Sequence, residues 1–512
     1  MRSFPRLSVS ATLALIGAAS LVDAREGATG ALVQYWRGGF GSMTGNRLEW
    51  THLRLELEER DGSLSGSGIL LAGPQLPSPV RLRAYGRMRA TRIELTFDDR
   101  DSRVACEGHG GSEFIEGECR RHGGRVDLRL VRVEPEVRAD SLLGVYDLDG
   151  GHRVQIGRDA LGLLMIDLRT GVVRSLFHKG GETYVAGPSL SVGHPAQWRL
   201  AFERDSGGAV TAVRIVDPSG ASRRAVRRAG WAEEDYSVLN ERDGVMLRGT
   251  LTLPARDDAP LPAIVWVHGS GPVTRHAAQF FPHYFADLGF AVLAVDKRGV
   301  GGSAGEYALP DGSSDNVRHL LRSADDVAWA IKTLKRDPRI DPTRIGLVGV
   351  SQAGWVMPAA AALETCAFTI TLSGGATELS REAFYSALTR EELADASLPS
   401  IDELLPRVRS MLPTDLDWTP TFARQPCPGL WLYGMKDRVN PSQLSIELLD
   451  WVRAFHDKDF TIVAFPDGNH ALLDVRIGGL AGHHVADRFV PDLFVTIERW
   501  LGQLWLASEP PG

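Results

Sequence analysis

An alternation of buried strands and helices in the second half of the chain restricts the possible folds more than any other feature. From about residue 236, short apolar runs such as "AIVWVHG", "FAVLAVD" and "RIGLVGV" are separated by segments with helical periodicity, such as "SADDVAWAIKTLKRD". Continuous apolar runs are typical of strands that are buried on both faces, and a helix is the usual crossover between parallel strands. The pattern therefore predicts an α/β domain over residues 233–512, with a doubly wound, mostly parallel sheet.

A polar segment interrupts this alternation. Residues at about 376–425 contain helical patterns and no strand-like run, and they follow an apolar run that ends in "LSGG". Open α/β sheets bind their ligands beyond the carboxyl ends of the strands. We therefore expect a helical cap over the functional site at about 376–425.

The first half of the chain has a different pattern. Residues 25–136 alternate apolar and polar side chains, as in "LRLELEERDGSLSGSGIL" and "RVDLRLVRV", with Gly and Asp turns between the runs. This alternation is typical of antiparallel strands, and it predicts a β module that is either a sandwich or a small barrel. Residues 137–232 continue in the same style, which predicts a second β module and an all-β N-terminal region.

The first residues are typical of an export signal. Arg2 and Arg6 precede an apolar run that ends near "VDA", a small-residue cleavage site. We expect a signal peptide at residues 1–24, a periplasmic or secreted protein, and no stable membrane span after cleavage. The run is shorter than the roughly 20 apolar residues of a spanning helix, and an uncleaved anchor is the alternative.

Four cysteines suit an oxidising compartment. Cys106 and Cys119 flank a glycine-rich stretch typical of a hairpin, which predicts a disulfide between them. Cys366 and Cys427 each begin a short apolar run; if these runs are neighbouring parallel strands, both thiols lie at the same end of the sheet, and we predict a second disulfide. Four buried free thiols are the alternative, and zinc binding is less favoured because there is no CxxC pair.

One serine lies in the context that nucleophilic catalysis requires. Ser351 of "GVSQAG" stands between a strand-like run and a helical run, with small residues around it. In such a nucleophile elbow, a sharp turn lifts the hydroxyl clear of the sheet, and the helix N-terminus directs N–H groups at the reaction centre. Ala353 replaces the last glycine of the usual G-x-S-x-G pattern. We predict that Ser351 is a nucleophile, with an ordinary glycine-rich turn as the alternative.

Later strand ends supply an acid and a base. Asp437 comes three residues after the glycine that ends "LWLYG", and His470 lies on the loop after the last strand-like run, "FTIVAFP". The chain order Ser351, Asp437, His470 is that of one serine hydrolase architecture and differs from the other designs. We predict that His470 is the general base and that Asp437 orients it. The less favoured alternatives are Asp467 for the acid and His483 or His484 for the base.

Two backbone N–H groups are candidates for an oxyanion hole. The loop "HGSGP" ends an earlier strand and can present the N–H of Ser270, while Gln352 follows the nucleophile directly. His268 is interpreted as a structural hydrogen-bonding residue. Asp296 and Arg298 of "DKRGVGGSAG" are interpreted as an ion pair that orders a loop.

These motifs together resemble the α/β-hydrolase superfamily over about residues 236–508. The segments "DGVMLRGTLTLP", "HGSGP", "DKRGVGGSAG" and a Gly-x-Ser-x-small-Gly elbow occur in this order, which is similar to exported bacterial esterase-like hydrolases. The resemblance implies a serine triad of Ser351, Asp437 and His470. The N-terminal β modules resemble the variable additions of such proteins, with no role implied.

We therefore expect a serine hydrolase that cleaves small-molecule carboxylic esters outside the cytoplasm, without a metal or an organic cofactor. A serine peptidase acting on short peptides is one alternative, and an envelope- or carbohydrate-binding protein with an inert hydrolase half is another. The net charge of −7 and the absence of a long basic block argue against a nucleic-acid partner. The sequence sets no oligomeric state.

Overall fold

The computed structural model describes residues 32–42, 46–71, 79–98, 103–121, 124–135, 139–159, 162–256, 260–277, 280–307 and 313–506. Backbone contacts divide this part of the chain into two units, which we call the α/β unit and the β unit. The α/β unit comprises described residues of 231–391 and 398–472, and the β unit those of 18–230, 392–397 and 473–512. No helix within the described ranges is long and apolar enough to cross a membrane. The predicted signal peptide at 1–24 lies outside them.

An eight-stranded sheet forms the centre of the α/β unit, in the order β18-β19-β21-β20-β22-β23-β25-β26. Six strands, β21, β20, β22, β23, β25 and β26, pair in parallel in this order. The β18–β19 hairpin adds an antiparallel edge next to β21. The strands are β18 (Trp231–Asn240), β19 (Val245–Pro254), β20 (Leu261–Val267), β21 (Ala291–Val295), β22 (Ile340–Val350), β23 (Thr369–Leu372), β25 (Gly429–Gly434) and β26 (Phe460–Phe465). The predicted mostly parallel sheet is confirmed.

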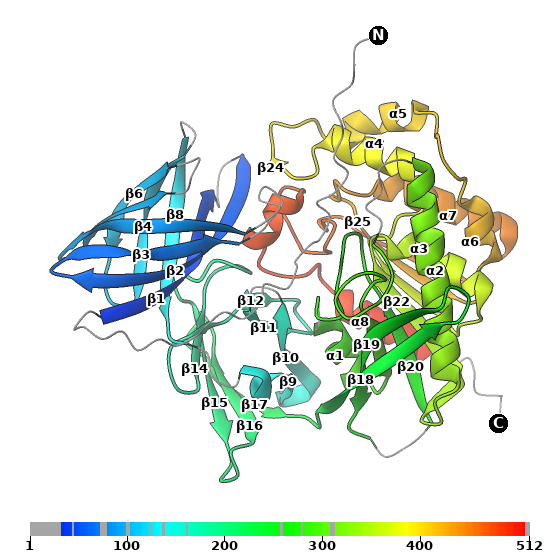
Figure 1. Cartoon of the computed structure of the whole chain (residues 1–512), viewed down its shortest axis with the longest axis horizontal. Helices are drawn as coiled ribbons and strands as arrows, with labels where there is room; N and C mark the ends of the chain where they lie inside the picture. The colour runs from blue at the N-terminus through cyan, green and yellow to red at the C-terminus, as the bar shows by residue number, and fades with distance from the viewer. Residues whose placement is uncertain are drawn as a thin grey trace. The chain divides into compact units, whose positions relative to one another are not determined.

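Crossover helices connect these strands because parallel neighbours need long connections. They are α1 (Phe280–Asp287), α2 (Ser313–Lys335), α3 (Ala353–Leu363) and α7 (Ser442–His456). Helices α2 and α3 contact each other and strand β22 (Figure 1). A continuous apolar core, to which Trp355, Met357 and Trp431 belong, joins the helices to the sheet.

The insertion between β23 and β25 is largely helical, as expected. It contains α4 (Leu379–Thr389), α5 (Ile401–Ser410) and α6 (Thr419–Arg424). A capping box between Ser400 and Glu403 fixes the start of α5. The insertion also contains a strand that the sequence pattern did not reveal, β24 (Ala394–Asp395), which pairs with β2 within the β unit.

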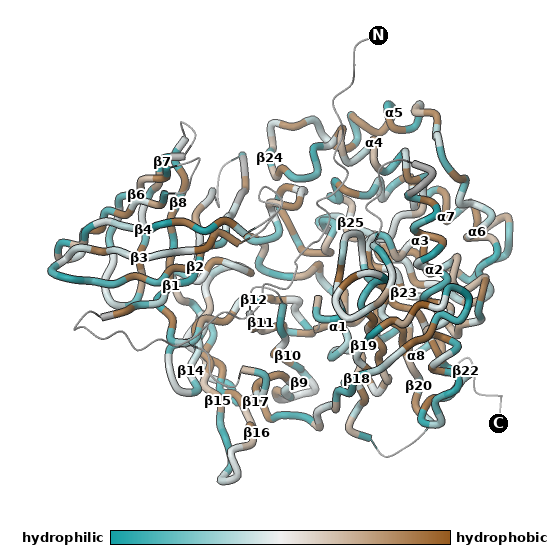
Figure 2. The backbone as a smooth tube through the Cα atoms, in the orientation of Figure 1, coloured by the Kyte–Doolittle hydropathy of each residue, from teal (hydrophilic) through white to brown (hydrophobic). Residues whose placement is uncertain are grey.

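Eight antiparallel strands of the β unit close into a barrel. Strand β1 pairs with both β2 and β8, so the ring has no free edge. The closed ring shows that the first β module is a barrel and not a sandwich. Figure 2 shows hydrophilic and hydrophobic residues alternating along these strands, as expected for strands with one face toward the interior. The strands are β1 (Leu32–Ser42), β2 (Arg47–Arg60), β3 (Ser63–Leu70), β4 (Val80–Arg89), β5 (Arg92–Asp98), β6 (Arg103–Gly110), β7 (Phe114–Arg121) and β8 (Gly124–Val133).

The predicted disulfide between Cys106 and Cys119 is confirmed. The two residues lie directly opposite each other on β6 and β7, and both are buried in the barrel core. The bond therefore links the strands of one hairpin, as the glycine-rich spacing indicated.

A second antiparallel sheet follows the barrel, in the order β12-β11-β10-β9-β17-β16-β15-β14-β13. It has its own apolar core, which includes Tyr146, Tyr184 and Phe202. The strands are β9 (Gly144–Leu148), β10 (His152–Asp159), β11 (Gly162–Asp167), β12 (Val173–Ser175), β13 (Phe177–His178), β14 (Thr183–Ala186), β15 (Trp198–Arg204), β16 (Val210–Val216) and β17 (Ser222–Arg227). The N-terminal half is therefore all-β, with two antiparallel modules.

The C-terminal segment differs from the sequence expectation, which placed it in the α/β domain. Described residues from 473 onward, including η3 (Leu480–Val485) and α8 (Leu493–Leu506), group with the β unit. Arg153 pairs with Glu498 at 2.5 Å, and Arg174 donates to the backbone carbonyl of Asp487. These partners are more than 300 residues apart in the chain, so no local pattern could have linked them.

Two buried histidines connect the barrel to this segment within the β unit. His52 Nε2 on β2 lies 2.9 Å from His484 Nδ1 in η3, and Ser191 Oγ lies 3.2 Å from the same Nδ1. Burial lowers the pKa of His484 to about 4. Burial also lowers the pKa of His52 well below its ordinary value, and the charges of His484, Arg37 and Arg54 lower it further.

This histidine pair predicts acid sensitivity of the β unit. Both folded-state pKa values lie below the roughly 6.5 of an unfolded histidine, so the unfolded chain binds protons more tightly. The contribution of the two neutral histidines to the free energy of unfolding is therefore fully present above about pH 6.5. It falls as the pH is lowered toward 4, by up to about 1.4 kcal/mol per pH unit for each histidine. Urea unfolding midpoints at pH 7 and pH 5 measure the loss, and His52→Gln with His484→Gln should reduce it. An equal pH dependence in this double variant would contradict the assignment.

Candidate active site

Ser351 occupies a sharp turn between β22 and α3. Its backbone φ is +54°, in the left-handed region that non-glycine residues rarely adopt. The Ser351 carbonyl accepts hydrogen bonds from the N–H groups of Gly354 at 2.9 Å and Gly375 at 3.2 Å, and the Ser351 N–H donates to the carbonyl of Leu372 at 2.9 Å. Hydrogen bonds to α3, to β23 and to the segment after β23 therefore hold the strained conformation in place.

Close packing explains the small residues around this turn. A Cβ atom at Gly349 would lie 2.5 Å from both the Ala353 Cβ and the Val267 carbonyl oxygen. A Cβ atom at Gly354 would lie 2.4 Å from the carbonyl oxygen of Gly375. Both glycines are needed for strand and helix to approach, whereas the buried methyl group of Ala353 is accommodated at its own position.

Asp437 and His470 form a buried hydrogen-bonded pair. His470 Nδ1 lies 2.8 Å from Asp437 Oδ2, and Asp437 Oδ1 accepts hydrogen bonds from the N–H groups of Val439 at 2.7 Å and Asn440 at 3.0 Å. Only 1% of Asp437 and 5% of His470 is exposed. Among the described residues, His470 Nε2 has no hydrogen-bond partner. The arrangement suits an imidazole that carries its proton on Nδ1 and keeps Nε2 free to act as a base.

All three predicted residues follow strands of the same parallel sheet. Ser351 follows β22, Asp437 follows β25 and His470 follows β26, and β23 lies between β22 and β25. Parallel strands end at the same edge of a sheet, so the three side chains come from one rim.

The alternatives for the acid and the base have different surroundings. The side chain of Asp467 is 62% exposed and forms an ion pair with Lys436 at 2.7 Å. His483 and His484 lie in η3 of the β unit.

Helix α4 supports the loop that carries the acid. The Tyr385 hydroxyl donates to the backbone carbonyl of Asp437 at 2.5 Å, and the Thr389 hydroxyl donates to that of Arg438 at 2.6 Å. Arg438 Nη1 returns a hydrogen bond of 2.9 Å to the Thr389 carbonyl. Sequence reasoning missed these residues, although Tyr385 and Thr389 are four positions apart and therefore share a helix face.

The loop that carries Ser270 passes close to the nucleophile. A Cβ atom at Gly269 would lie 3.4 Å from the Cβ of Ser351. Lys297, which sequence reasoning also missed, donates from Nζ to the carbonyl of Gly269 and to Oε1 of Gln352, the latter at 2.8 Å. Burial lowers the pKa of Lys297 to about 7.

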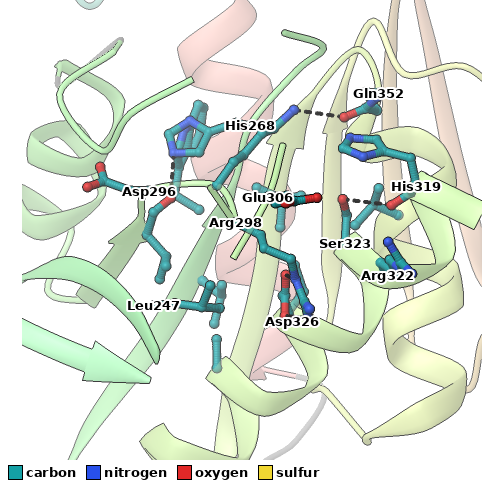
Figure 3. A pocket seen from close by; sticks show the side chains of 18 residues that line it. Leu247, His268, Asp296, Arg298, Glu306, His319, Arg322, Ser323, Asp326 and Gln352 are labelled. Carbon is teal, nitrogen blue, oxygen red and sulfur yellow. Dashed lines mark hydrogen bonds and ion pairs between the residues drawn. The ribbon is translucent and has the colours of Figure 1, made fainter. Parts of the chain in front are cut away.

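A cavity of about 70 Å³ lies beside these groups, lined by side chains that include His268, Lys297, His319 and Gln352 (Figure 3). His268 Nε2 lies 3.0 Å from the Val295 carbonyl, and burial together with the charge of Lys297 lowers the pKa of His268 to about 3. His268 is therefore neutral, in agreement with a structural role.

The expected ion pair between Asp296 and Arg298 is not the arrangement observed. Arg298 pairs with Asp326 and Asp243, each at 2.6 Å. Asp296 instead accepts hydrogen bonds from the N–H groups of Arg275 at 2.6 Å and Gly302 at 2.8 Å. Both residues order loops, but each uses partners from other segments of the chain.

The predicted second disulfide is wrong for this structure. Cys366 and Cys427 are free thiols with their Sγ atoms 3.0 Å apart, whereas a disulfide bond is about 2.05 Å long. They precede the neighbouring parallel strands β23 and β25, so the expected proximity of the two thiols is confirmed. Strand adjacency brings the thiols together but does not require them to be oxidised. Their hydrogen bond and burial raise the pKa of Cys366.

Within the described residues, no group of three or more His, Cys, Asp or Glu side chains is arranged to hold a metal ion.

The sheet order, the crossover helices and the strained strand–turn–helix at Ser351 define an α/β-hydrolase fold in the α/β unit. The family sequence model of the X-Pro dipeptidyl-peptidases (S15 family) matches residues 243–386. This match includes the Ser351 elbow but ends before Asp437 and His470.

Curated relatives match only parts of the chain. An uncharacterized peptidase, YuxL, of Bacillus subtilis (strain 168) is 30% identical over 143 residues, which are 27% of this chain and 21% of that protein. The thiohydrolase aneE of Aspergillus aculeatus is 34% identical over 124 residues, 24% of this chain and 36% of its own length. The chain thus spans about a fifth and about a third of these relatives.

Among solved structures, a dienelactone hydrolase-like promiscuous phosphotriesterase, P91, from metagenomic libraries is 16% identical. It covers 55% of this chain and 98% of its own, with a TM-score of 0.38.

Proposed function

We propose that the protein is a serine hydrolase that cleaves carboxylic esters by way of an acyl-enzyme. The observation that carries this proposal is the buried Asp437–His470 hydrogen bond, which leaves His470 Nε2 free at the sheet edge where Ser351 stands on its strained turn. A buried imidazole with one nitrogen held by a carboxylate and the other unpartnered is suited to general-base catalysis.

In the proposed reaction, His470 Nε2 takes the proton of the Ser351 hydroxyl as its oxygen attacks the ester carbonyl. Asp437 holds the ring and stabilises the imidazolium that forms. The N–H groups of Gln352 and Ser270 stabilise the oxyanion of the tetrahedral intermediate. The imidazolium then gives its proton to the departing alcohol, and water attacks the acyl-enzyme with His470 again as the base. These steps use side-chain and backbone groups of the protein together with water.

A serine peptidase acting on short peptides is the second candidate. It is favoured by the match to the X-Pro dipeptidyl-peptidase model and by a relative that is named as a peptidase. A binding protein with an inert hydrolase half has less support, because the hydrogen-bonded Asp437–His470 pair has the geometry of a working base. Action outside the cytoplasm is part of our proposal and is supported by the Cys106–Cys119 disulfide.

Matched substrates separate an esterase from a peptidase. Nitrophenyl esters react with many serine enzymes, so we would compare ethyl esters of acetate to octanoate with N-ethyl amides of the same acids and with alanyl-prolyl nitroanilide. We expect the highest kcat/KM for one of the ethyl esters. A higher kcat/KM for the nitroanilide than for every ethyl ester would identify a peptidase. Parallel assays with Ser351→Ala measure the uncatalysed background.

A further inference from the structure

Lys297 occupies an unusual place for a lysine. It follows the carboxyl end of β21, and its half-buried side chain lines the same cavity as Gln352, the residue after Ser351. No carboxylate within the described residues lies at ion-pair distance from its Nζ; both acceptors of Nζ are neutral oxygens. Removing an ammonium from water without an opposite charge costs stability, which agrees with its lowered pKa of about 7. Lys297 therefore contributes little to folding through its charge.

The two acceptors belong to the two loops that carry the proposed oxyanion donors. The Gly269 carbonyl and the Ser270 N–H are parts of one peptide group, and a trans peptide group is planar with these two bonds pointing in opposite directions. A hydrogen bond that holds the Gly269 oxygen therefore also sets the direction of the Ser270 N–H. It also polarises the peptide group, which makes that N–H a stronger donor.

The second acceptor, the side-chain oxygen of Gln352, belongs to the residue that supplies the other oxyanion N–H. Gln352 supplies its own N–H in the proposed reaction, and its side-chain oxygen receives the second hydrogen bond from Lys297 at 2.8 Å (Figure 3). One ammonium thus connects the loop after β20 to the residue that follows the nucleophile. The connection fixes the separation of two N–H groups that come from segments about 80 residues apart.

We propose that Lys297 is a positioning residue that clamps the two halves of the oxyanion hole through the Gly269 carbonyl and the Gln352 side chain. This inference rests on the proposed serine hydrolase function. It assigns Lys297 no contact with the substrate: its effect passes through the peptide group of Gly269 and Ser270 and through Gln352.

The test compares Lys297→Met with the full-length parent enzyme on the best ethyl ester. Loss of a single oxyanion donor costs roughly 100- to 1,000-fold in kcat, and loss of a donor's alignment should cost less. We expect kcat to fall by about 10- to 100-fold with KM nearly unchanged. The affinity for an alkyl boronic acid, whose adduct with the serine places a negative oxygen in the oxyanion hole, should fall by a similar factor. Stability should change little, because the cost of a half-buried cation without an opposite charge and the two hydrogen bonds that it donates are removed together.

Two further variants make the test specific. Gln352→Met removes one of the two acceptors and should cost less than Lys297→Met, and the double variant should be no worse than Lys297→Met alone, because both changes break the same clamp. Lys332→Met is the matched control. This lysine of α2 is also half-buried, but its Nζ lies 4.3 Å from the centre of the Trp329 ring, and we expect parental kinetics.

The outcomes separate this inference from the function on which it rests. If Lys297→Met keeps the parental kcat and boronate affinity while Ser351→Ala is inactive, the clamp is wrong and the hydrolase proposal stands. If Ser351→Ala is as active as the parent, the hydrolase proposal itself is wrong. A fall in kcat that only matches a loss of folded protein would show a structural role for Lys297 and would overturn the clamp.

Discussion

Replacing Ser351 with alanine should reduce kcat on the preferred ester by about 10⁴-fold or more, because the variant lacks the oxygen that forms the acyl-enzyme. Alanine fits the turn, since the serine side chain is buried and differs from alanine only by its hydroxyl group. Stability should therefore be close to that of the parent. Steady-state kinetics measure the loss, and labelling with a fluorophosphonate followed by peptide mass analysis locates the modified residue at Ser351.

A matched control for this variant is the serine that follows the neighbouring strand. Ser373 follows β23, is fully buried, and has a φ of +47°, close to the +54° of Ser351. Ser373→Ala removes the same group from a similar backbone conformation, and we expect activity and labelling to be retained. Parental activity of Ser351→Ala, or labelling of another serine, would contradict the nucleophile assignment.

Replacing Asp437 with asparagine should have the next largest effect, a fall of about 10⁴-fold in kcat. The side-chain oxygen of asparagine can keep the hydrogen bonds from Val439 and Asn440, which turns its NH₂ group toward His470 Nδ1. An NH₂ donor there requires an unprotonated Nδ1, so the proton moves to Nε2 and the base is blocked. The measurement is kcat near neutral pH.

Asp467→Asn is the appropriate comparison because Asp467 is the acidic residue nearest to His470 in the sequence. Its exposed carboxylate pairs with Lys436, and exposed ion pairs contribute little to stability or orientation. We expect its kcat to stay close to that of the parent. If Asp467→Asn lost activity and Asp437→Asn kept it, the acid would have been assigned to the wrong residue.

Local patterns were sufficient for the fold class. Apolar runs such as "AIVWV" identify strands buried on both faces, and alternation identifies strands with one buried face, because burial imposes these periods residue by residue. The same patterns could not distinguish a sandwich from a barrel. That choice depends on whether β1 pairs with both β2 and β8, which lie far apart in the chain.

Some residues of the candidate site could be identified from local patterns, and others could not. Ser351, Asp437 and His470 could be selected from the sequence because each follows a recognisable strand, and strand ends of a parallel sheet share one edge. Tyr385, Lys297 and the pairing of β24 with β2 could not, because their partners come from other loops and other elements.

The sequence alone therefore determined the α/β-hydrolase class of the second half, the all-β character of the first, the Cys106–Cys119 link and the three residues proposed for catalysis. Only the tertiary structure decided the closure of the barrel, the place of the C-terminal segment in the β unit, the free state of Cys366 and Cys427, and the position of Lys297 between Gly269 and Gln352. The physical reason is the range of the interactions. Burial periodicity and turn chemistry act over a few neighbouring residues, whereas hydrogen bonds between distant loops exist only after packing has brought those loops together.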